Sequence, residues 1–170
     1  MREEEKMARD VYLALYAQWG QAVFQNIASS EQTHMDTVLD LLQGYGVADP
    51  AGEQGQFTNP DLQAMYDQLV AQGSQSLADA LKVGATIEEI DIADLREQMT
   101  LTDENAIQTV YASLESGSEN HLRAFTSTLL RQTGETYQPQ YLSVADYQAI
   151  IGSETGSGQG AGGNGYRGGR

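Results

Sequence analysis

The stretch NIASSEQTHMDTVLDLL, residues 26–42, combines an apolar helical stripe with a pair of polar side chains on one flank. Glu31 and His34 stand three residues apart, so their side chains leave the same side of a helix. The stretch predicts an amphipathic helix that starts at Ser29 or Ser30 and runs to Tyr45. The apolar stripe is formed by Met35, Val38, Leu41 and Leu42.

The rest of the chain shows the same helical spacing and almost no strand signal. Asn59 before Pro60 is typical of a helix start. A break is expected near residues 90–92, where β-branched side chains crowd, and Thr100 or Thr102 is expected to cap the last long helix. The other expected helices span residues 2–19, 60–73, 76–99, 103–132 and, after Ser143, 144–151.

This order of elements predicts an all-α fold with four long helices and two minor ones. Four long amphipathic helices close most simply as a bundle, and the loop after Tyr45 with the helix at 60–73 can form its long central crossover. Residues 1–151 are therefore predicted to form one helical domain. Residues 152–170 hold nine of the eighteen glycines and are predicted to be a disordered tail.

Composition excludes several classes of function. A net charge of −15 with nine Lys and Arg argues against binding of nucleic acid or anionic lipid. The chain has no cysteine, which rules out disulfides, zinc–thiolate sites and cysteine-held iron–sulfur clusters; haem is not expected either. No apolar run approaches the roughly 20 residues that span a bilayer. The charged N-terminus lacks a signal-peptide pattern, so a cytoplasmic location is expected, with export after removal of a leader as the alternative.

The residues that suit chemistry are carboxylates and histidines on the predicted helices. In di-iron and di-manganese bundles, two helices each supply a Glu-x-x-His pair and each of the other two supplies a Glu. His121 shares a helix face with Leu114, Ser118 and Phe125, which points it toward the core. Glu5 and Glu88 lie on the apolar sides of their helices, beside Tyr12 and beside Gly84, respectively. The predicted metal ligands are Glu5, Glu31, His34, Glu88 and His121, with Glu89 and Asp91 as rivals of Glu88.

Each of these residues also has a plain structural interpretation. A single Glu-x-x-His pair occurs often by chance on a solvated helix face. His121 can be a core histidine held by a hydrogen bond. Tyr12 can donate a hydrogen bond or act as a radical site near a metal, but a core tyrosine with a satisfied hydroxyl is the simpler interpretation.

Two short runs resemble known proteins. EKMARDVY, residues 5–12, is similar to the first-helix signature Glu-x-x-Ala-Arg-x-x-Tyr of rubrerythrins and related ferritin-like proteins, and IASSEQTH, residues 27–34, is similar to their second-helix pattern. Residues 3–150 as a whole resemble the family catalogued as domain of unknown function 2202. That resemblance rests on EEEKMARDVYLALY, SEQTHMDTVLDLL, LVAQGSQSLADALKVGATIEEIDI and GSENHLRAF. It implies a ferritin-like four-helix bundle without assigning an activity.

By this resemblance, the five predicted ligands fall where the metal ligands of such bundles fall, except that the fourth helix lacks its glutamate. The residue three before His121 is Ser118. The candidates to compensate are Glu89, Asp91, Glu115 and Glu119, and a single bound ion is the alternative. Without cysteines, the chain has no rubredoxin-like iron centre.

The function predicted from the sequence is that of a ferritin-like metal-binding protein. Its partners would be one or two Fe or Mn ions, and its chemistry would involve oxygen, peroxide or the oxidation of Fe(II). The alternative is a metal-free helical module that binds an unknown partner or has a structural role. Whether the chain is an enzyme, and whether it forms a homodimer, stays open at this point.

Overall fold

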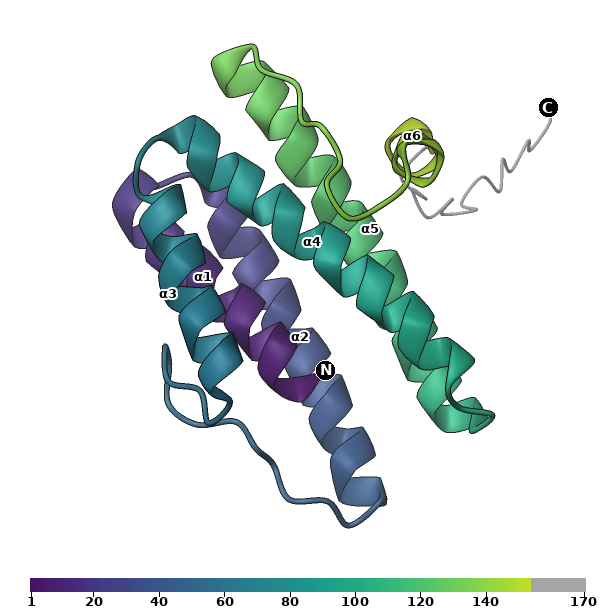
Figure 1. Cartoon of the computed structure of the whole chain (residues 1–170). Helices are drawn as coiled ribbons and strands as arrows, with labels where there is room; N and C mark the ends of the chain where they lie inside the picture. The colour runs from purple at the N-terminus through teal and green to yellow at the C-terminus, as the bar shows by residue number, and fades with distance from the viewer. Residues whose placement is uncertain (154–170) are drawn as a thin grey trace, which may run out of the picture.

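The structure is a computed structural model in which residues 1–153 are described. These residues form six α-helices and no strand, so the all-α prediction is confirmed. The predicted glycine-rich tail lies, from residue 154 on, outside the described residues. The helices in Figure 1 are α1 (Arg2–Trp19), α2 (Ala22–Gly44), α3 (Pro60–Gly73), α4 (Leu77–Thr100), α5 (Asn105–Thr133) and α6 (Val144–Gly152).

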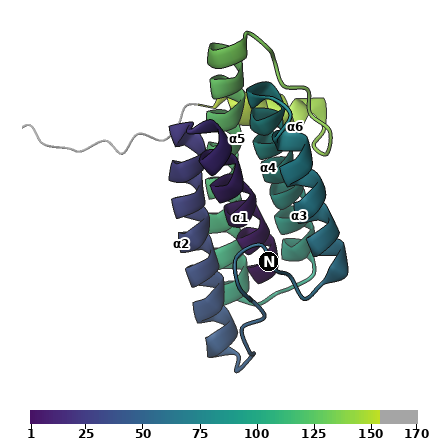
Figure 2. The ribbon, with the colours of Figure 1, turned by 90° about the vertical axis from the view of Figure 1, so that its left-hand side faces the viewer.

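The helices form a bundle built from two antiparallel pairs. α1 packs along α2 and α4 packs along α5, and the two pairs meet through contacts of α2 with α5 and of α1 with α4 (Figures 1 and 2). α3 covers α1 and α4 from outside, and α6 lies against α5. α2 and α4 run in the same direction, and the connection between them carries α3. No helix within residues 1–153 has the length and apolarity needed to cross a membrane.

Most helix ends follow from local chemistry as expected. Asn59 accepts a hydrogen bond from the backbone N–H of Asp61 at the start of α3, and Ser143 accepts one from Asp146 at the start of α6. Gly20 ends α1 in the left-handed region, with φ 63°.

The predicted start of the second helix is wrong. α2 begins at Ala22, seven residues before Ser29, and the Ser29 hydroxyl donates to the Gln25 carbonyl inside the helix. Phe24 is fully buried and Ile27 is 5% exposed, so tertiary packing extends the helix beyond the serines that resemble caps.

Two further boundary predictions fail for related reasons. α4 continues without a break through residues 90–92, because the buried Ile92 packs in the core. Thr100 is the last residue of α4, and the residue that precedes α5 is Glu104, which makes no side-chain cap. Thr102 instead accepts a hydrogen bond from the Glu104 N–H in the connecting turn.

A buried charge pair ties the long connection between α2 and α3 to α1. Lys6 Nζ lies 2.8 Å from Asp10 Oδ2, and neither side chain is exposed. Lys6 also donates to the Gln56 carbonyl at 3.0 Å, and the Gly55 N–H donates to Asp10 at 2.8 Å. The connection is therefore bound to the bundle through its backbone as well as through Phe57, whose ring lies 4.0 Å from Lys6 Nζ.

Candidate metal centre

The four helices of the two pairs bring acidic and histidine side chains together inside the bundle. Glu5 comes from α1, Glu31 and His34 from α2, Glu88 from α4 and His121 from α5. Glu31 and Glu88 are fully buried and Glu5 is 1% exposed. These are the five residues that the sequence predicts as ligands, and the structure places them in two overlapping groups.

The first group contains Glu5, Glu31 and His34. His34 Nδ1 lies 2.9 Å from Glu31 Oε2 and 3.1 Å from Glu5 Oε2. The three side chains each offer a nitrogen or oxygen atom within 4.8 Å of the other two, which suits a shared metal ion.

The second group contains Glu31, Glu88 and His121. His121 Nδ1 lies 2.7 Å from Glu31 Oε1 and 3.5 Å from Glu88 Oε2. Glu31 therefore turns one oxygen toward each histidine and belongs to both groups. The two imidazole rings stack with their centroids 5.4 Å apart.

Proton affinities in the two groups are strongly perturbed. Burial alone lowers the pKa of His34, but the Glu31 and Glu5 carboxylates outweigh it and raise the pKa to about 9. Burial likewise lowers the pKa of His121, but Glu88 and Glu31 raise it to about 10. Burial raises the pKa of Glu31, yet the two histidines bring it down to about 2. The charged forms of both histidines and of Glu31 are thus favoured by their mutual contacts.

The pKa values of Glu5 and Glu88 shift upward, in the opposite direction to that of Glu31. Burial raises the pKa of Glu5 to about 7, against the pull of His34. Burial also raises the pKa of Glu88, against the charge of His121. These acids sit where a proton or another positive charge is favoured.

Tyr12 supports Glu88 directly. Its hydroxyl donates to Glu88 Oε1 at 2.6 Å and its ring packs between Phe24 and Phe125, with centroids 6.5 Å and 5.0 Å away. Burial raises the pKa of Tyr12 well above its ordinary value, so the phenol stays protonated as a donor. Gly84 makes room for the Phe125 ring, because a Cβ at Gly84 would lie 2.6 Å from it.

All four weaker candidates lie outside both groups. Glu89 is buried, but it accepts hydrogen bonds from the Tyr137 hydroxyl and the Gln140 N–H and so holds the segment after α5. Glu115 and Glu119 both bind Arg96 across α4 and α5, at 2.5 Å and 3.2 Å. The fourth, Asp91, is 4% exposed and interacts electrostatically with Glu5, Glu88 and Glu31.

Two residues that shape the centre are absent from the sequence prediction. Ser30 Oγ lies 2.9 Å from His121 Nε2 and holds the far side of that ring. Gly117 faces His34 so closely that a Cβ there would lie 2.5 Å from His34 Nε2. A glycine in the middle of a long helix is unfavourable by itself, and that was the signal available in the sequence.

Four buried atoms of the centre make no well-aligned hydrogen bond within the described residues. Within residues 1–153, both oxygens of Glu31, Oε2 of Glu88 and Nδ1 of His121 are buried without a well-aligned hydrogen bond, despite their short separations. Buried polar atoms are normally paired, so these oxygen and nitrogen lone pairs are available to a positively charged ligand. A cation that accepts lone pairs from oxygen and nitrogen would satisfy them together.

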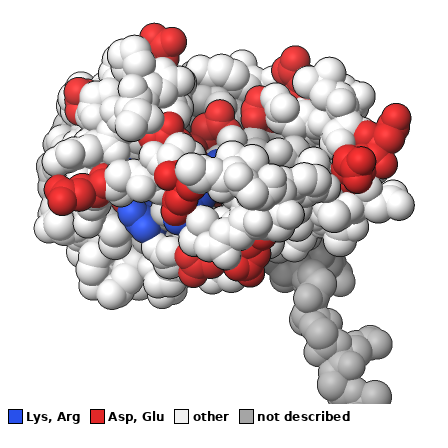
Figure 3. Space-filling view, turned by 90° about the horizontal axis from the view of Figure 1, so that it is seen from below, with Lys and Arg blue, Asp and Glu red and all other residues white. Residues whose placement is uncertain are grey.

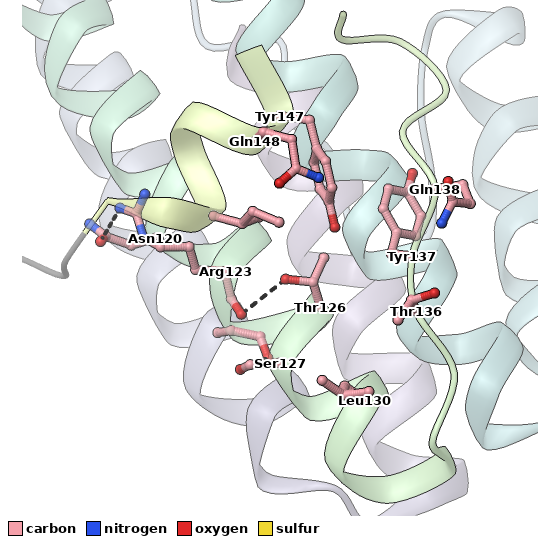
Figure 4. A pocket seen from close by; sticks show the side chains of 12 residues that line it. Asn120, Arg123, Thr126, Ser127, Leu130, Thr136, Tyr137, Gln138, Tyr147 and Gln148 are labelled. Carbon is pink, nitrogen blue, oxygen red and sulfur yellow. Dashed lines mark hydrogen bonds between the residues drawn. The ribbon is translucent and has the colours of Figure 1, made fainter. Parts of the chain in front are cut away.

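A separate groove of about 700 Å³ lies between α5, α6 and the segment before α6 (Figure 4). Its walls include Arg123, Leu130, Tyr137 and Tyr147, and none of the five predicted ligands lines it. The Arg123 guanidinium donates hydrogen bonds to the Asn120 side chain and to the Ile150 carbonyl, and so links the end of α6 to α5. This groove is not part of the centre.

Comparisons with known proteins agree with the expected family. A family model described as an uncharacterized protein domain, DUF2202, matches residues 1–154. The chain is 52% identical over 157 residues to uncharacterized protein MJ0754 of Methanocaldococcus jannaschii, an alignment that covers 91% of this chain and 84% of that protein. The crystal structure of hypothetical protein MJ0754 superimposes with a TM-score of 0.89, over 91% of this chain and 89% of that one.

Proposed function

We propose that this chain, which belongs to the DUF2202 family of uncharacterized protein domains, is a metal-binding protein whose centre holds two ions bridged by Glu31. The observation that carries the proposal is the position of Glu31. It is fully buried, it turns one oxygen toward His34 and the other toward His121, and it is shared by both ligand groups. A carboxylate between two imidazoles and two further carboxylates is the expected environment of a bridging ligand.

The donor set favours Fe or Mn. Carboxylates and imidazoles without thiolates suit these ions, and three protein donors around each ion leave coordination positions open. The pattern of one Glu from α1, Glu-x-x-His from α2, one Glu from α4 and a His from α5 supports a ferritin-like bundle related to the rubrerythrins. Bound ions of this kind would supply redox chemistry toward oxygen or peroxide, or the oxidation of Fe(II).

The chain's own residues would position and shield the ions. The Tyr12 hydroxyl holds one oxygen of Glu88 and leaves Oε2 facing His121. The rings of Phe24 and Phe125 pack around Tyr12 and exclude water from this side. Ser30 holds His121 at Nε2, which leaves Nδ1 turned toward Glu31 and Glu88. Such outer hydrogen bonds fix the orientation of metal ligands.

A metal-free helical module is the second candidate. Charged His34 and His121 beside Glu31 already neutralise part of the buried negative charge, as the raised pKa values of about 9 and 10 indicate. In that case the cluster would be a structural charge network. Metal content separates the two candidates.

The test is metal stoichiometry by elemental mass spectrometry after loading with Fe or Mn. We expect two ions in the wild type, one in His34→Ala, one in His121→Ala and none in Glu31→Gln, because only Glu31 serves both groups. Glu115→Gln is the matched control and should keep two ions, since Glu115 binds Arg96 outside the centre. A folded wild type that retains no metal would establish the metal-free module instead.

A further inference from the structure

The two proposed ions have unequal surroundings. The helix that carries His121 offers Ser118 three residues earlier, where a second Glu-x-x-His pair would have its glutamate. Ser118 is fully buried, and its hydroxyl makes no hydrogen bond within the described residues. The centre therefore lacks the carboxylate that would balance Glu31.

The directions of the helices show which level of the bundle lacks this carboxylate. α2 and α4 run from top to bottom in Figure 1, whereas α5 runs from bottom to top. His34 follows Glu31 by one turn on α2, and Asp91 follows Glu88 by one turn on α4. On α5, Ser118 precedes His121 by one turn. Because α5 runs opposite to α2 and α4, His34, Asp91 and Ser118 are each displaced by one turn in the same direction along the bundle from Glu31, Glu88 and His121. The contact between Gly117 and His34 confirms that this part of α5 faces that level.

Asp91 is a buried carboxylate with an unpaired oxygen within the described residues. It is 4% exposed, and its Oδ2 atom makes no hydrogen bond within residues 1–153. Burial and the charges of Glu5, Glu88 and Glu31 raise its pKa well above the ordinary value. Burying a carboxylate beside three others is costly unless a positive charge joins them.

We propose that Asp91 supplies the carboxylate that Ser118 lacks and is a further ligand of the ion held by Glu5, Glu31 and His34. This inference rests on the proposed metal function and deepens it. It makes the His34 ion the one with three carboxylates, Glu5, Glu31 and Asp91, and one imidazole. The His121 ion keeps two carboxylates and one imidazole, so the two ions differ in affinity and in open positions.

The test is calorimetric titration of the metal-free protein with Mn(II), which counts the ions and gives each affinity. Asp91→Asn should lose the ion of the His34 group or bind it about tenfold or more weakly. Asp94→Asn, the same change one turn further along α4 at a half-buried site, should bind both ions as the wild type does. The double variant Asp91→Asn, His34→Ala should bind as many ions as His34→Ala alone. The double variant Asp91→Asn, His121→Ala should lose both ions.

Two readouts keep the inference separable from folding and from the proposed function. Burial disfavours the charged form of the Asp91 carboxyl and raises its pKa, and Asp91→Asn replaces this carboxyl with a neutral amide of similar shape, so the metal-free variant should melt no lower than the wild type. In a crystal of the Mn(II)-loaded wild type, anomalous density should lie at ligand distance from a carboxylate oxygen of Asp91. If the wild type binds two ions and Asp91→Asn binds both with unchanged affinities, this inference is overturned and the metal function stands. The same holds if the anomalous density lies away from Asp91. A wild type that binds no Mn(II) overturns the metal function itself.

Discussion

His34 is held in place by contacts on two opposite sides. Its Nδ1 faces Glu5 and Glu31, and its Nε2 faces the backbone of α5 at Gly117. Any side chain at Gly117 would push the ring toward the carboxylates or rotate it away from them. The glycine thus sets the distance between an imidazole on α2 and the ligands around it.

Gly117→Ala should weaken metal binding without unfolding the protein. The new Cβ would lie 2.5 Å from His34 Nε2, so the ring must move, while alanine favours the helix by about 1 kcal/mol over glycine. We expect the affinity for the ion of the His34 group to fall by about tenfold or more and the melting temperature to change little. Calorimetric titration with Mn(II) and a thermal melt of the metal-free variant measure these effects.

Gly44→Ala is the control for this change. Gly44 is the last residue of α2, and a Cβ there meets no atom within 4 Å. It should leave both metal affinities unchanged. If Gly117→Ala bound both ions like the wild type, His34 would not be constrained by α5.

At the residue scale, the spacing of polar side chains predicted which carboxylates and histidines lie together inside the bundle. Glu31 and His34 are found through their three-residue spacing, and His121 through the apolar face that it shares. The choice between Glu89 and Asp91 could not be made in this way. Glu89 is taken up by Tyr137 and by the backbone of the segment after α5, and such long-range partners leave no periodic signal.

Among the helices, α1 has a double role. One side carries Glu5 and Tyr12 into the centre, and another carries Lys6 and Asp10 to the long connection before α3. Asp10 accepts from Lys6, from the Gly55 N–H and from the Arg9 guanidinium, so three groups depend on one carboxylate. The connection and the centre are therefore coupled through the placement of a single helix.

Asp10→Ala should destabilise the protein by about 3–5 kcal/mol, because it leaves Lys6 buried without its ion-pair partner. Urea denaturation followed by circular dichroism measures this change in the free energy of unfolding. Asp40→Ala, at an exposed position of α2, is the comparison and should fall within about 0.5 kcal/mol of the wild type. Equal stabilities of the two variants would mean that water reaches Lys6.

At the element scale, the number and order of the helices were predictable, and several ends were not. Asn59 and Ser143 act as caps because their side chains accept from the following turn. Ser29 has the same chemistry, but the burial of Phe24 and Ile27 carries α2 past it. The β-branched residues near Ile92 disfavour a helix only locally, and core packing outweighs that preference.

Charge is distributed differently inside and outside the molecule. Figure 3 shows one end of the molecule, where acidic side chains are spread widely and basic ones occupy a small area. The net charge of −15 draws cations toward the whole surface. Inside, the three carboxylates of the two groups, Glu5, Glu31 and Glu88, meet only two histidines, so the centre also favours added positive charge. Both features favour the binding of cations. Without a metal, they favour the binding of protons to His34 and His121.

The metal-free protein should accordingly lose stability as the pH rises from about 6.5 to about 10. His34 and His121 have folded pKa values of about 9 and about 10 against an ordinary 6.5, so the folded chain binds their protons more tightly. Their stabilising effect is fully present below pH 6.5 and is lost as the pH rises through both folded values. Glu5, with a folded pKa of about 7 against 4.5, contributes with the same sign between those two values. Glu31, lowered to about 2, acts only in more acidic solution.

Metal loading should reverse this trend, because ions bind the deprotonated ligands and release the same protons. The measurement is the melting temperature of metal-free and Mn(II)-loaded protein between pH 6 and pH 10. We expect the metal-free protein to melt lower at pH 9.5 than at pH 6.5, and the rise in melting temperature caused by Mn(II) to grow with pH. The double variant His34→Ala, His121→Ala should lose both effects. A metal-free wild type that is more stable at pH 9.5 than at pH 6.5 would mean that the histidines are neutral, and that Glu31 meets no positive charge until a metal arrives.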